Sequence, residues 1–174
     1  MSFDLSEAVP YSLSPPANVL NAASICALTE SHRGDFERFL VALDSSSRCS
    51  RFGYAANDAA LVAHSQSALR AACCMFGVFI EHKLAGVAEI YRCHSADKYD
   101  VLLVVDRPLR KLGLGWNLLS CSMQWAQSAN AESVRLVFSR NNWAMRKLAK
   151  RARATLDLSR DELNAEIPLG PGPP

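Results

Sequence analysis

The sequence predicts one domain of the mixed α/β class, because segments with helical and strand periodicity alternate along most of the chain. The 174 residues have the length of one domain, and 49% of them are hydrophobic, which is enough to form a core. We expect the domain to span residues 23–168. Residues 1–22 contain three prolines, residues 169–174 are mostly proline and glycine, and both ends are expected to be flexible.

The first part of the domain is expected to contain a strand and two helices. A short strand is predicted over residues 24–28. Thr29 is a candidate N-cap for a helix that ends at the serine-rich stretch 44–47. A second helix is predicted over residues 58–72, with Asn57 as its cap.

The centre of the sequence predicts three strands. Residues 75–81 and 84–92 are expected to pair as an antiparallel hairpin with a two-residue turn. A third strand is predicted over residues 99–105. It ends in the continuous apolar run Val101–Val105, which is typical of a strand that is buried on both faces.

The last part predicts two helices and three strands. Apolar residues at helical spacing predict a helix over residues 113–129, which is followed by a strand over 133–138. A short basic helix is predicted over residues 142–152. Residues 155–158 and 163–167 are expected to close the domain as a hairpin.

The composition argues against several functional classes. The formal net charge is only +2, which is weak for a nucleic-acid-binding protein. The six cysteines form no CxxC pair, so we expect neither a metal site nor a disulfide framework. The N-terminus lacks the basic and apolar regions of a secretory signal, and no apolar run is long enough to span a bilayer. We therefore expect a cytoplasmic protein with neither a nucleic-acid nor a membrane partner.

One segment indicates a chemical function, and it joins the strand 99–105 to the helix 113–129. Residues 106–115 read Asp-Arg-Pro-Leu-Arg-Lys-Leu-Gly-Leu-Gly. Glycines at a helix start let backbone N–H groups approach a ligand, and the helix N-terminus attracts anions. Arg110 and Lys111 add two positive charges at the same place. The segment therefore predicts an anion site, and phosphate is the anion that suits it best.

Two common phosphate motifs do not match this segment. A dinucleotide-binding fingerprint requires a third glycine where this chain has Leu118. A P-loop requires Gly-Lys followed by Ser or Thr, which is absent from the segment. A glycine-containing helix start without any ligand is the alternative that the segment by itself leaves open.

The order of these segments resembles the GNAT superfamily of acetyltransferases. Arg110, Gly113 and Gly115 match the R-x-x-G-x-G pyrophosphate motif of that family. Val105 matches the hydrophobic residue that ends the family's central strand. Asn142 resembles the asparagine at the start of the helix after the following strand. The resemblance extends over nearly the whole predicted domain.

The resemblance implies both a fold and a cofactor. The implied fold is a mixed, mostly antiparallel sheet of about six or seven strands with about four flanking helices, splayed apart after the central strand. The implied acyl donor is acetyl-CoA. Its pantetheine arm would pair with the end of that strand, its pyrophosphate would bind the amides of the glycine motif, and the asparagine would lie near the cofactor. The residues so implied are Leu103, Val104, Val105, Arg110, Lys111, Leu112, Gly113, Leu114, Gly115 and Asn142.

Acyl transfer to an amine needs a proton acceptor. A free lysine-like amine has a pKa of about 10.4, so a general base is expected to neutralise it. Glu89 and Asp100 are the candidate bases, because both lie in apolar strands, where the pKa of a carboxyl group tends to rise. If Cys93 pairs with Lys98, then Tyr91 faces Asp100 and shares a face with Glu89. The three side chains would then form one polar cluster beside the thioester.

Two features leave the acid–base chemistry open. Either carboxylate could instead pair with Arg92 or Lys98 at the end of the sheet. Many GNAT members also carry a tyrosine seven residues after the asparagine as the general acid, and this chain has Ala149 there. Solvent or Tyr91 would have to supply that proton, or catalysis would be weak. Asp100 also resembles an acidic residue at the start of this strand in the bacterial branch near the protein-lysine acetyltransferases, as Arg48–Gly53 resembles a segment before that branch's second helix.

The remaining polar and aromatic residues admit simpler interpretations. His94 lies in a predicted turn and is either solvated or catalytic. Trp116 and Trp143 are expected to pack in the core rather than to stack on an adenine. The basic residues around the last helix are expected to be solvated, with contact to the cofactor's 3′-phosphate as the alternative. They are Arg140, Arg146, Lys147, Lys150, Arg151 and Arg153.

The function that the sequence predicts is acetyl-CoA-dependent N-acetylation. An acetyl group would move directly from the thioester to an amine acceptor, either a protein lysine or a small molecule, in a monomer or a homodimer. The alternative is a non-catalytic acyl-CoA-binding or regulatory domain, which the missing tyrosine at Ala149 suggests.

Overall fold

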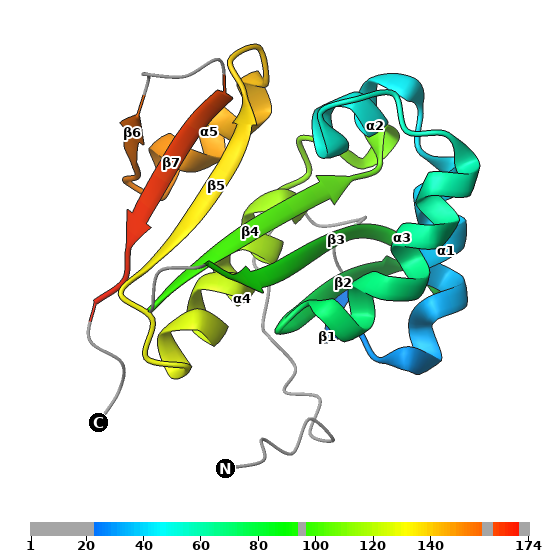
Figure 1. Cartoon of the computed structure of the whole chain (residues 1–174), viewed down its shortest axis with the longest axis horizontal. Coiled ribbons are helices and arrows are strands. Elements are labelled where there is room, and N and C mark those ends of the chain that lie inside the picture. Colours follow the sequence, from blue (N-terminus) through cyan, green and yellow to red (C-terminus); the bar gives the residue numbers. More distant parts are fainter. Residues whose placement is uncertain (1–22, 94–96, 158–161, 171–174) are drawn as a thin grey trace.

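Strands in the described part of the chain form one seven-stranded sheet with helices on both faces (Figure 1). The structure is a computed structural model that describes residues 23–93, 97–157 and 162–170. Within these ranges the strand order is β1-β2-β3-β4-β5-β7-β6, and all neighbours are antiparallel except β4 and β5, which are parallel. The predicted mixed α/β class and mostly antiparallel sheet are therefore confirmed.

The elements follow the predicted order closely. The strands are β1 Ala23–Ala27, β2 Cys74–Ile80, β3 Lys83–Arg92, β4 Lys98–Val105, β5 Ser133–Ser139, β6 Thr155–Asp157 and β7 Glu162–Pro168. The helices are α1 Arg33–Ala42, α2 Ser45–Phe52, α3 Asp58–Ala71, α4 Leu114–Ser128 and α5 Trp143–Arg151. Two short 3-10 turns, η1 Glu30–His32 and η2 Arg107–Leu109, precede α1 and α4.

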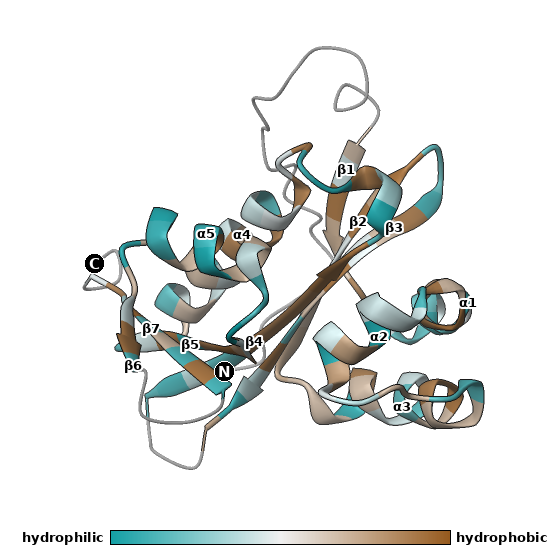
Figure 2. Cartoon of the chain, turned by 90° about the horizontal axis from the view of Figure 1, so that it is seen from above, coloured by the Kyte–Doolittle hydropathy of each residue, from teal (hydrophilic) through white to brown (hydrophobic). Residues whose placement is uncertain are grey.

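The helices divide the core between the two faces of the sheet. Figure 2 shows α1, α2 and α3 on one face and α4 and α5 on the other. One buried cluster includes Leu118 of α4 and Ile90 of β3, and a second includes Phe36 of α1 and Val87 of β3. Because side chains alternate along a strand, Glu89 shares the face of Val87 and lies under α1–α3.

The sheet splays apart between β4 and β5. These strands pair only from Lys98 with Ser133 to Asp100 with Arg135, and in Figure 1 they diverge beyond that point. The splay implied by the family resemblance is therefore present. It also explains why the prediction that Val101–Val105 is buried on both faces is wrong in part. Leu102 and Leu103 are only partly buried, because none of the described strands covers the side of β4 that β5 leaves.

Helix α2 is the one helix in the described residues that the sequence analysis missed. The serine-rich stretch was predicted to end a helix, but Asp44 begins a new one. Its carboxylate accepts hydrogen bonds from the Ser47 amide at 3.0 Å and the Ser47 hydroxyl at 2.6 Å. Arg48 then donates to the Leu43 carbonyl at 2.8 Å and to Asp58 at 2.7 Å. Serines are weak helix formers, so the cap and these tertiary contacts decide the local structure.

Most other local predictions are confirmed. Asn57 caps α3 by accepting a hydrogen bond from the Ala60 amide at 2.9 Å, and β6 pairs with β7 as a hairpin. The prediction that Trp143 packs in the core is wrong, because the residue is 66% exposed and the Arg146 guanidinium lies over its ring. It sits on the solvent side of the first turn of α5. Trp116 is partly buried against the core, as predicted.

Some predictions lie outside the described residues. They concern the flexible ends 1–22 and 171–174 and the role of His94. Among the helices that the structure does describe, none has the length and the apolar character needed to cross a membrane.

Candidate functional site

A cavity of about 400 Å³ opens where β4, α2, α4 and α5 meet. The C-terminal half of β4 forms an apolar wall with Leu103, Val104 and Val105, and the turn before α4 forms the floor. Every residue predicted to bind a cofactor lines this cavity except Leu112, which packs against the core. The tertiary structure therefore gathers segments around positions 104, 113 and 142 into one site.

The turn before α4 presents unpaired backbone donors. Gly113 is the N-cap of α4 and has a φ of 86°, a left-handed conformation that favours glycine. The first hydrogen bond of the helix joins the Asn117 amide to the Gly113 carbonyl at 3.1 Å, so the amides before Asn117 in this turn have no partner within the helix. A Cβ added to Gly113 would meet nothing within 4 Å, so its place beside the cavity is open. Such a helix start suits a phosphate group.

Gly115 has a different role in the same turn. A Cβ at this position would lie 3.4 Å from Leu148 Cδ1 and 3.8 Å from Val105 Cγ2. These are ordinary van der Waals distances, so the position lies at the contact of α4 with β4 and α5 and has room for a Cβ but for little more. This contact brings the helix N-terminus and the end of β4 into the same cavity.

Arg110 anchors this part of the site. Its Nε donates to the Val105 carbonyl at 3.1 Å, and its Nη2 donates to the Ser47 hydroxyl at 2.6 Å. The side chain thus ties the glycine turn to β4 and to α2. Its charge still contributes to the cavity, which it lines.

The cavity wall is strongly cationic. No Asp or Glu of the described residues lines the cavity, whereas five basic side chains do. They are Arg51, Arg110, Lys111, Lys147 and Arg151. The Arg151 guanidinium lies 3.9 Å from the centre of the Trp116 ring, which fixes its position on α5. Asn142 lines the cavity and caps α5, because its Oδ1 accepts a hydrogen bond from the Met145 amide at 3.2 Å. The whole wall is therefore suited to a ligand with several negative charges and an apolar arm.

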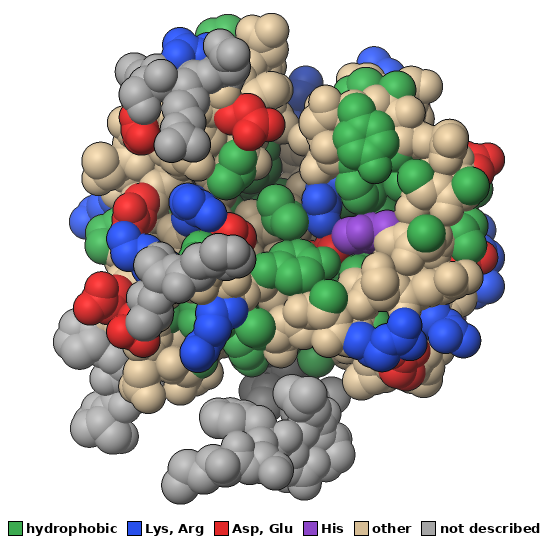
Figure 3. Space-filling view, in the orientation of Figure 1, with side chains coloured by type: hydrophobic (Ala, Val, Ile, Leu, Met, Phe, Trp, Pro, Cys, Tyr) green, Lys and Arg blue, Asp and Glu red, His purple; other side chains and the backbone are tan. Residues whose placement is uncertain are grey.

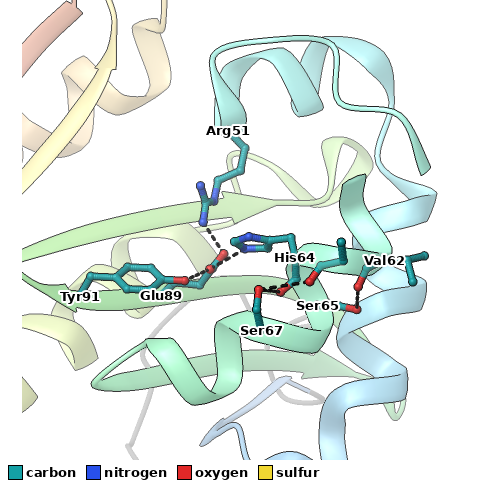
Figure 4. A network of polar contacts seen from close by, with 8 residues as sticks. Arg51, Val62, His64, Ser65, Ser67, Glu89 and Tyr91 are labelled. Carbon is teal, nitrogen blue, oxygen red and sulfur yellow. Dashed lines mark hydrogen bonds and ion pairs between the residues drawn. The ribbon is translucent and has the colours of Figure 1, made fainter. Parts of the chain in front are cut away.

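A second polar group lies on the other face of the sheet, around the buried carboxylate of Glu89 (Figure 4). The Glu89 side chain is fully buried, and Arg51 of α2 donates to its Oε1. Its Oε2 contacts His64 Nε2 of α3 at 2.8 Å and accepts from the Tyr91 hydroxyl at 2.7 Å. Three elements therefore supply the partners of one carboxylate.

These contacts set the protonation of the group. Burial alone would raise the pKa of Glu89, but the charge of Arg51 and the bonds from His64 and Tyr91 lower that pKa to about 2. Burial, and then the neighbouring Glu89 carboxylate, raise the pKa of Tyr91. Glu89 is therefore ionised and Tyr91 is neutral near pH 7.

Sequence comparison decides the family. The model of the acetyltransferase (GNAT) family matches residues 37–153, which is more than half of the chain. This chain belongs to the GNAT acetyltransferase family. No curated protein sequence shows a significant match to this GNAT protein.

Solved structures agree on the fold of this GNAT protein. The GNAT domain of S. lividans PAT superposes with a TM-score of 0.74 at 14% identity, over 84% of this chain and 90% of that one. RimL, a ribosomal L7/L12 alpha-N-protein acetyltransferase solved in complex with coenzyme A, has a TM-score of 0.68 at 16% identity, over 87% and 97% of the two chains. An acetyltransferase of the GNAT family from Streptococcus pneumoniae has a TM-score of 0.66 at 15% identity, over 85% and 99%. At these identities the likeness shows a shared fold.

The GNAT cofactor fits the residues of the cavity. A cationic wall without described carboxylates suits the phosphates of a coenzyme A molecule, and the open helix N-terminus suits its pyrophosphate. The apolar surface of β4 and the strand edge that β5 leaves free suit an extended pantetheine arm.

The predicted polar cluster of the GNAT site is only partly assembled. Tyr91 does pair with Asp100 across β3 and β4, and the Cys93 amide bonds to the Lys98 carbonyl at 3.0 Å, as the assumed register requires. Glu89 and Tyr91 contact each other. Asp100 instead forms a two-pronged ion pair with Arg135 of β5, at 2.6 and 2.8 Å.

The alternative partners considered for the two carboxylates are wrong. Lys98 bonds to Glu166 at 2.6 Å, and Arg92 donates to the Tyr99 hydroxyl at 3.1 Å. The reason is that β5 and β7 bring their own charged side chains beside β4 at the paired end of the sheet. Neither Glu89 nor Asp100 lines the cavity.

Sequence reasoning missed Arg51 and His64 as members of the site. Arg51 lies in the segment that resembles the protein-lysine acetyltransferase branch, which was the only signal for it. His64 occupies one position of an ordinary amphipathic helix. His64 is 25 residues from Glu89 in the sequence, and Arg51 is 38 residues from Glu89. No local sequence pattern could therefore reveal these contacts.

Proposed function

We propose that this GNAT protein transfers an acetyl group from acetyl-CoA to an amine acceptor, either a protein lysine or a small molecule. The observation that carries the proposal is the cationic cavity, which joins an open helix N-terminus to the unpaired edge of β4. A ligand that bears phosphates at one end and an extended amide-containing arm at the other matches both features.

The residues proposed to hold the donor follow from their positions. The amides of residues 111–115 and the Lys111 side chain would bind the pyrophosphate, whereas the Arg110 amide already donates to the Arg107 carbonyl at 3.3 Å. The backbone of Leu103–Val105 would pair with the pantetheine arm, and Asn142 would lie beside it. Lys147 and Arg151 are placed on the cavity wall, where a further phosphate would find positive charge.

Bound acetyl-CoA supplies an acetyl group activated as a thioester, so the protein has to position the amine and accept its proton. Asp100 and Glu89 were predicted as bases and Tyr91 as an acid, and these roles stay predictions. The contacts favour a positioning role for Glu89, because three donors already occupy a carboxylate whose pKa is about 2. Asp100 has both oxygens engaged by Arg135.

Donor binding is the first test of the proposal. Acetyl-CoA at 100-fold its Kd should stabilise the protein by about 2.7 kcal/mol, which is measured as an increase in Tm. Release of free coenzyme A thiol, followed with a panel of lysine peptides and small amines, then tests turnover. A protein that shows no increase in Tm with acetyl-CoA would contradict the proposal.

One observation favours a second function, a non-catalytic acyl-CoA-binding domain. Ala149 is fully buried where many GNAT members carry the tyrosine acid, and the Tyr91 hydroxyl is engaged by Glu89. This alternative predicts an increased Tm with acetyl-CoA and no thiol release with any amine of the panel.

A further inference from the structure

His64 is the titratable member of the Glu89 cluster that has no role in the proposed donor site and was not among the predicted acid and base residues. Its imidazole lies on α3, and its side chain is 26% exposed, whereas the Glu89 side chain beside it is not exposed at all. The ring is held edge-on by Phe52 at 5.2 Å and by Phe36 at 6.1 Å between ring centres. It is therefore fixed in orientation and still reached by solvent.

The hydrogen bond to Glu89 decides which ring nitrogen is free. An ionised carboxylate only accepts hydrogen bonds, so the proton of neutral His64 must lie on Nε2, which contacts Glu89 Oε2 at 2.8 Å. Nδ1 then carries the lone pair, and it has no hydrogen-bond partner among the residues that the structure describes. A carboxylate that orients an imidazole and stabilises its charged form is the arrangement that makes histidine an effective base.

The surroundings of His64 place it on the face opposite α4. Its charged neighbour is Glu89 from β3, which is also bonded to Tyr91 from β3 and to Arg51 from α2. Helix α1 adds the ring of Phe36. Arg51 also lines the donor cavity, so the two sites meet at this side chain. Figure 3 shows the surface in the orientation of Figure 1, where basic, acidic and apolar side chains lie side by side. The Glu89 cluster and the donor cavity therefore adjoin through Arg51, while His64 itself stands outside the cavity lining.

We propose that His64 is the catalytic residue that takes the proton from the acceptor amine, and that Glu89 is its positioning residue. The inference rests on the proposed acetyltransferase function. As the amine nitrogen bonds to the acetyl carbon, its N–H bond breaks and the proton bonds to Nδ1. The C–S bond of the thioester breaks, and the thiolate leaves and takes a proton from solvent. The imidazolium that forms is neutralised by Glu89 until it releases its proton to water.

The test compares the wild-type protein with His64→Gln. Glutamine can still donate to Glu89, but it does not titrate, so the contact is kept and the base is lost. We expect kcat to fall by about 10²- to 10⁴-fold, while the Kd for acetyl-CoA stays within about twofold. The wild-type kcat/KM should rise with pH as the base loses its proton, and this rise should be missing in the variant, which carries no ionisable group at this position.

Two further measurements separate a chemical role from a structural one. Added imidazole should restore part of the activity of His64→Ala, which a merely structural histidine would not permit. The matched control is His82→Asn at the exposed β2–β3 turn, where φ is 64° and asparagine is tolerated, and it should keep wild-type kcat.

The outcomes distinguish the two proposals. If the wild-type protein acetylates amines and His64→Gln keeps its kcat and its pH profile, the role of His64 is overturned and the acetyltransferase function stands. If the wild-type protein binds acetyl-CoA but acetylates no amine of the panel, both are overturned together.

Discussion

The two faces of the sheet carry sites that are built in opposite ways. The donor cavity takes its glycine turn and its strand wall from one stretch, Leu103 to Trp116, with α2 and α5 closing it, and it presents backbone amides and cationic side chains without a described carboxylate. The cluster on the other face brings Arg51, His64 and Glu89 together from three elements, and its opposite charges pair with each other, although the buried Arg51 Nε finds no hydrogen-bond partner among the described residues.

This contrast predicts different responses to mutation. A site that presents unpaired donors and positive charge is completed by its ligand, so changes there should alter affinity more than stability. A buried cluster whose charges pair with each other is part of the folded structure, so removing one member leaves another unsatisfied.

The largest effect is expected from Glu89→Ala. The change leaves the Arg51 side chain, which is only 6% exposed, as a buried charge without its partner. We expect the free energy of unfolding to fall by about 3–5 kcal/mol, measured by urea denaturation. Glu30→Ala removes a carboxylate from an exposed pair with Arg33 and should cost less than about 1 kcal/mol. If both variants lost the same free energy of unfolding, the Glu89 cluster would be no more important for stability than an exposed ion pair.

Gly113→Asp should mainly weaken donor binding. It places a negative charge at the anion site, and a like charge near 4 Å in a partly screened site costs about 4 kcal/mol. We expect the Kd for acetyl-CoA, measured by calorimetry, to rise by at least about 100-fold. Gly113→Ala is the matched control, because it keeps the strain of the left-handed conformation without the charge. An aspartate variant that binds as tightly as the alanine variant would show that no phosphate lies there.

Acid should destabilise the Glu89 cluster in a defined range. The pKa of Glu89 is lowered in the folded protein, from 4.5 to about 2, so its stabilising effect is complete above pH 4.5 and is lost as the pH falls toward 2. In Glu89→Gln this dependence should be absent. The stability difference between the two proteins, followed by denaturation at a series of pH values, should shrink through that range. A constant difference would indicate that Glu89 is not ionised in the folded state.

The smallest effect is expected at the paired end of β4 and β5. The Asp100–Arg135 ion pair is partly exposed, with 25% and 42% of the two side chains accessible, so solvent screens it. A double-mutant cycle with Asp100→Asn and Arg135→Gln should give a coupling energy of about 0.2–1 kcal/mol, measured by urea denaturation. Asp100→Asn should leave the Kd for acetyl-CoA unchanged. A marked loss of donor affinity would mean that this pair controls the splay of the two strands.

The fold was predicted well where local patterns decide it. The hairpin of β2 and β3, the Asn57 cap and the glycine start of α4 all follow from residues that lie next to each other in sequence. Helix α2 was missed because its serines are weak helix formers. Its formation depends on Asp44 and on Arg48, whose guanidinium reaches Leu43 and Asp58.

The sequence by itself determined the mixed α/β class, the order of the elements and the position of the anion site. These features depend on periodicity and on a motif in which Gly113 and Gly115 act through their own backbone. Only the tertiary structure decided that Asp100 pairs with Arg135, and that Glu89 collects Arg51, His64 and Tyr91. The reason is physical: a buried charge must find its partner in space, and the chain brings that partner from 38 residues away.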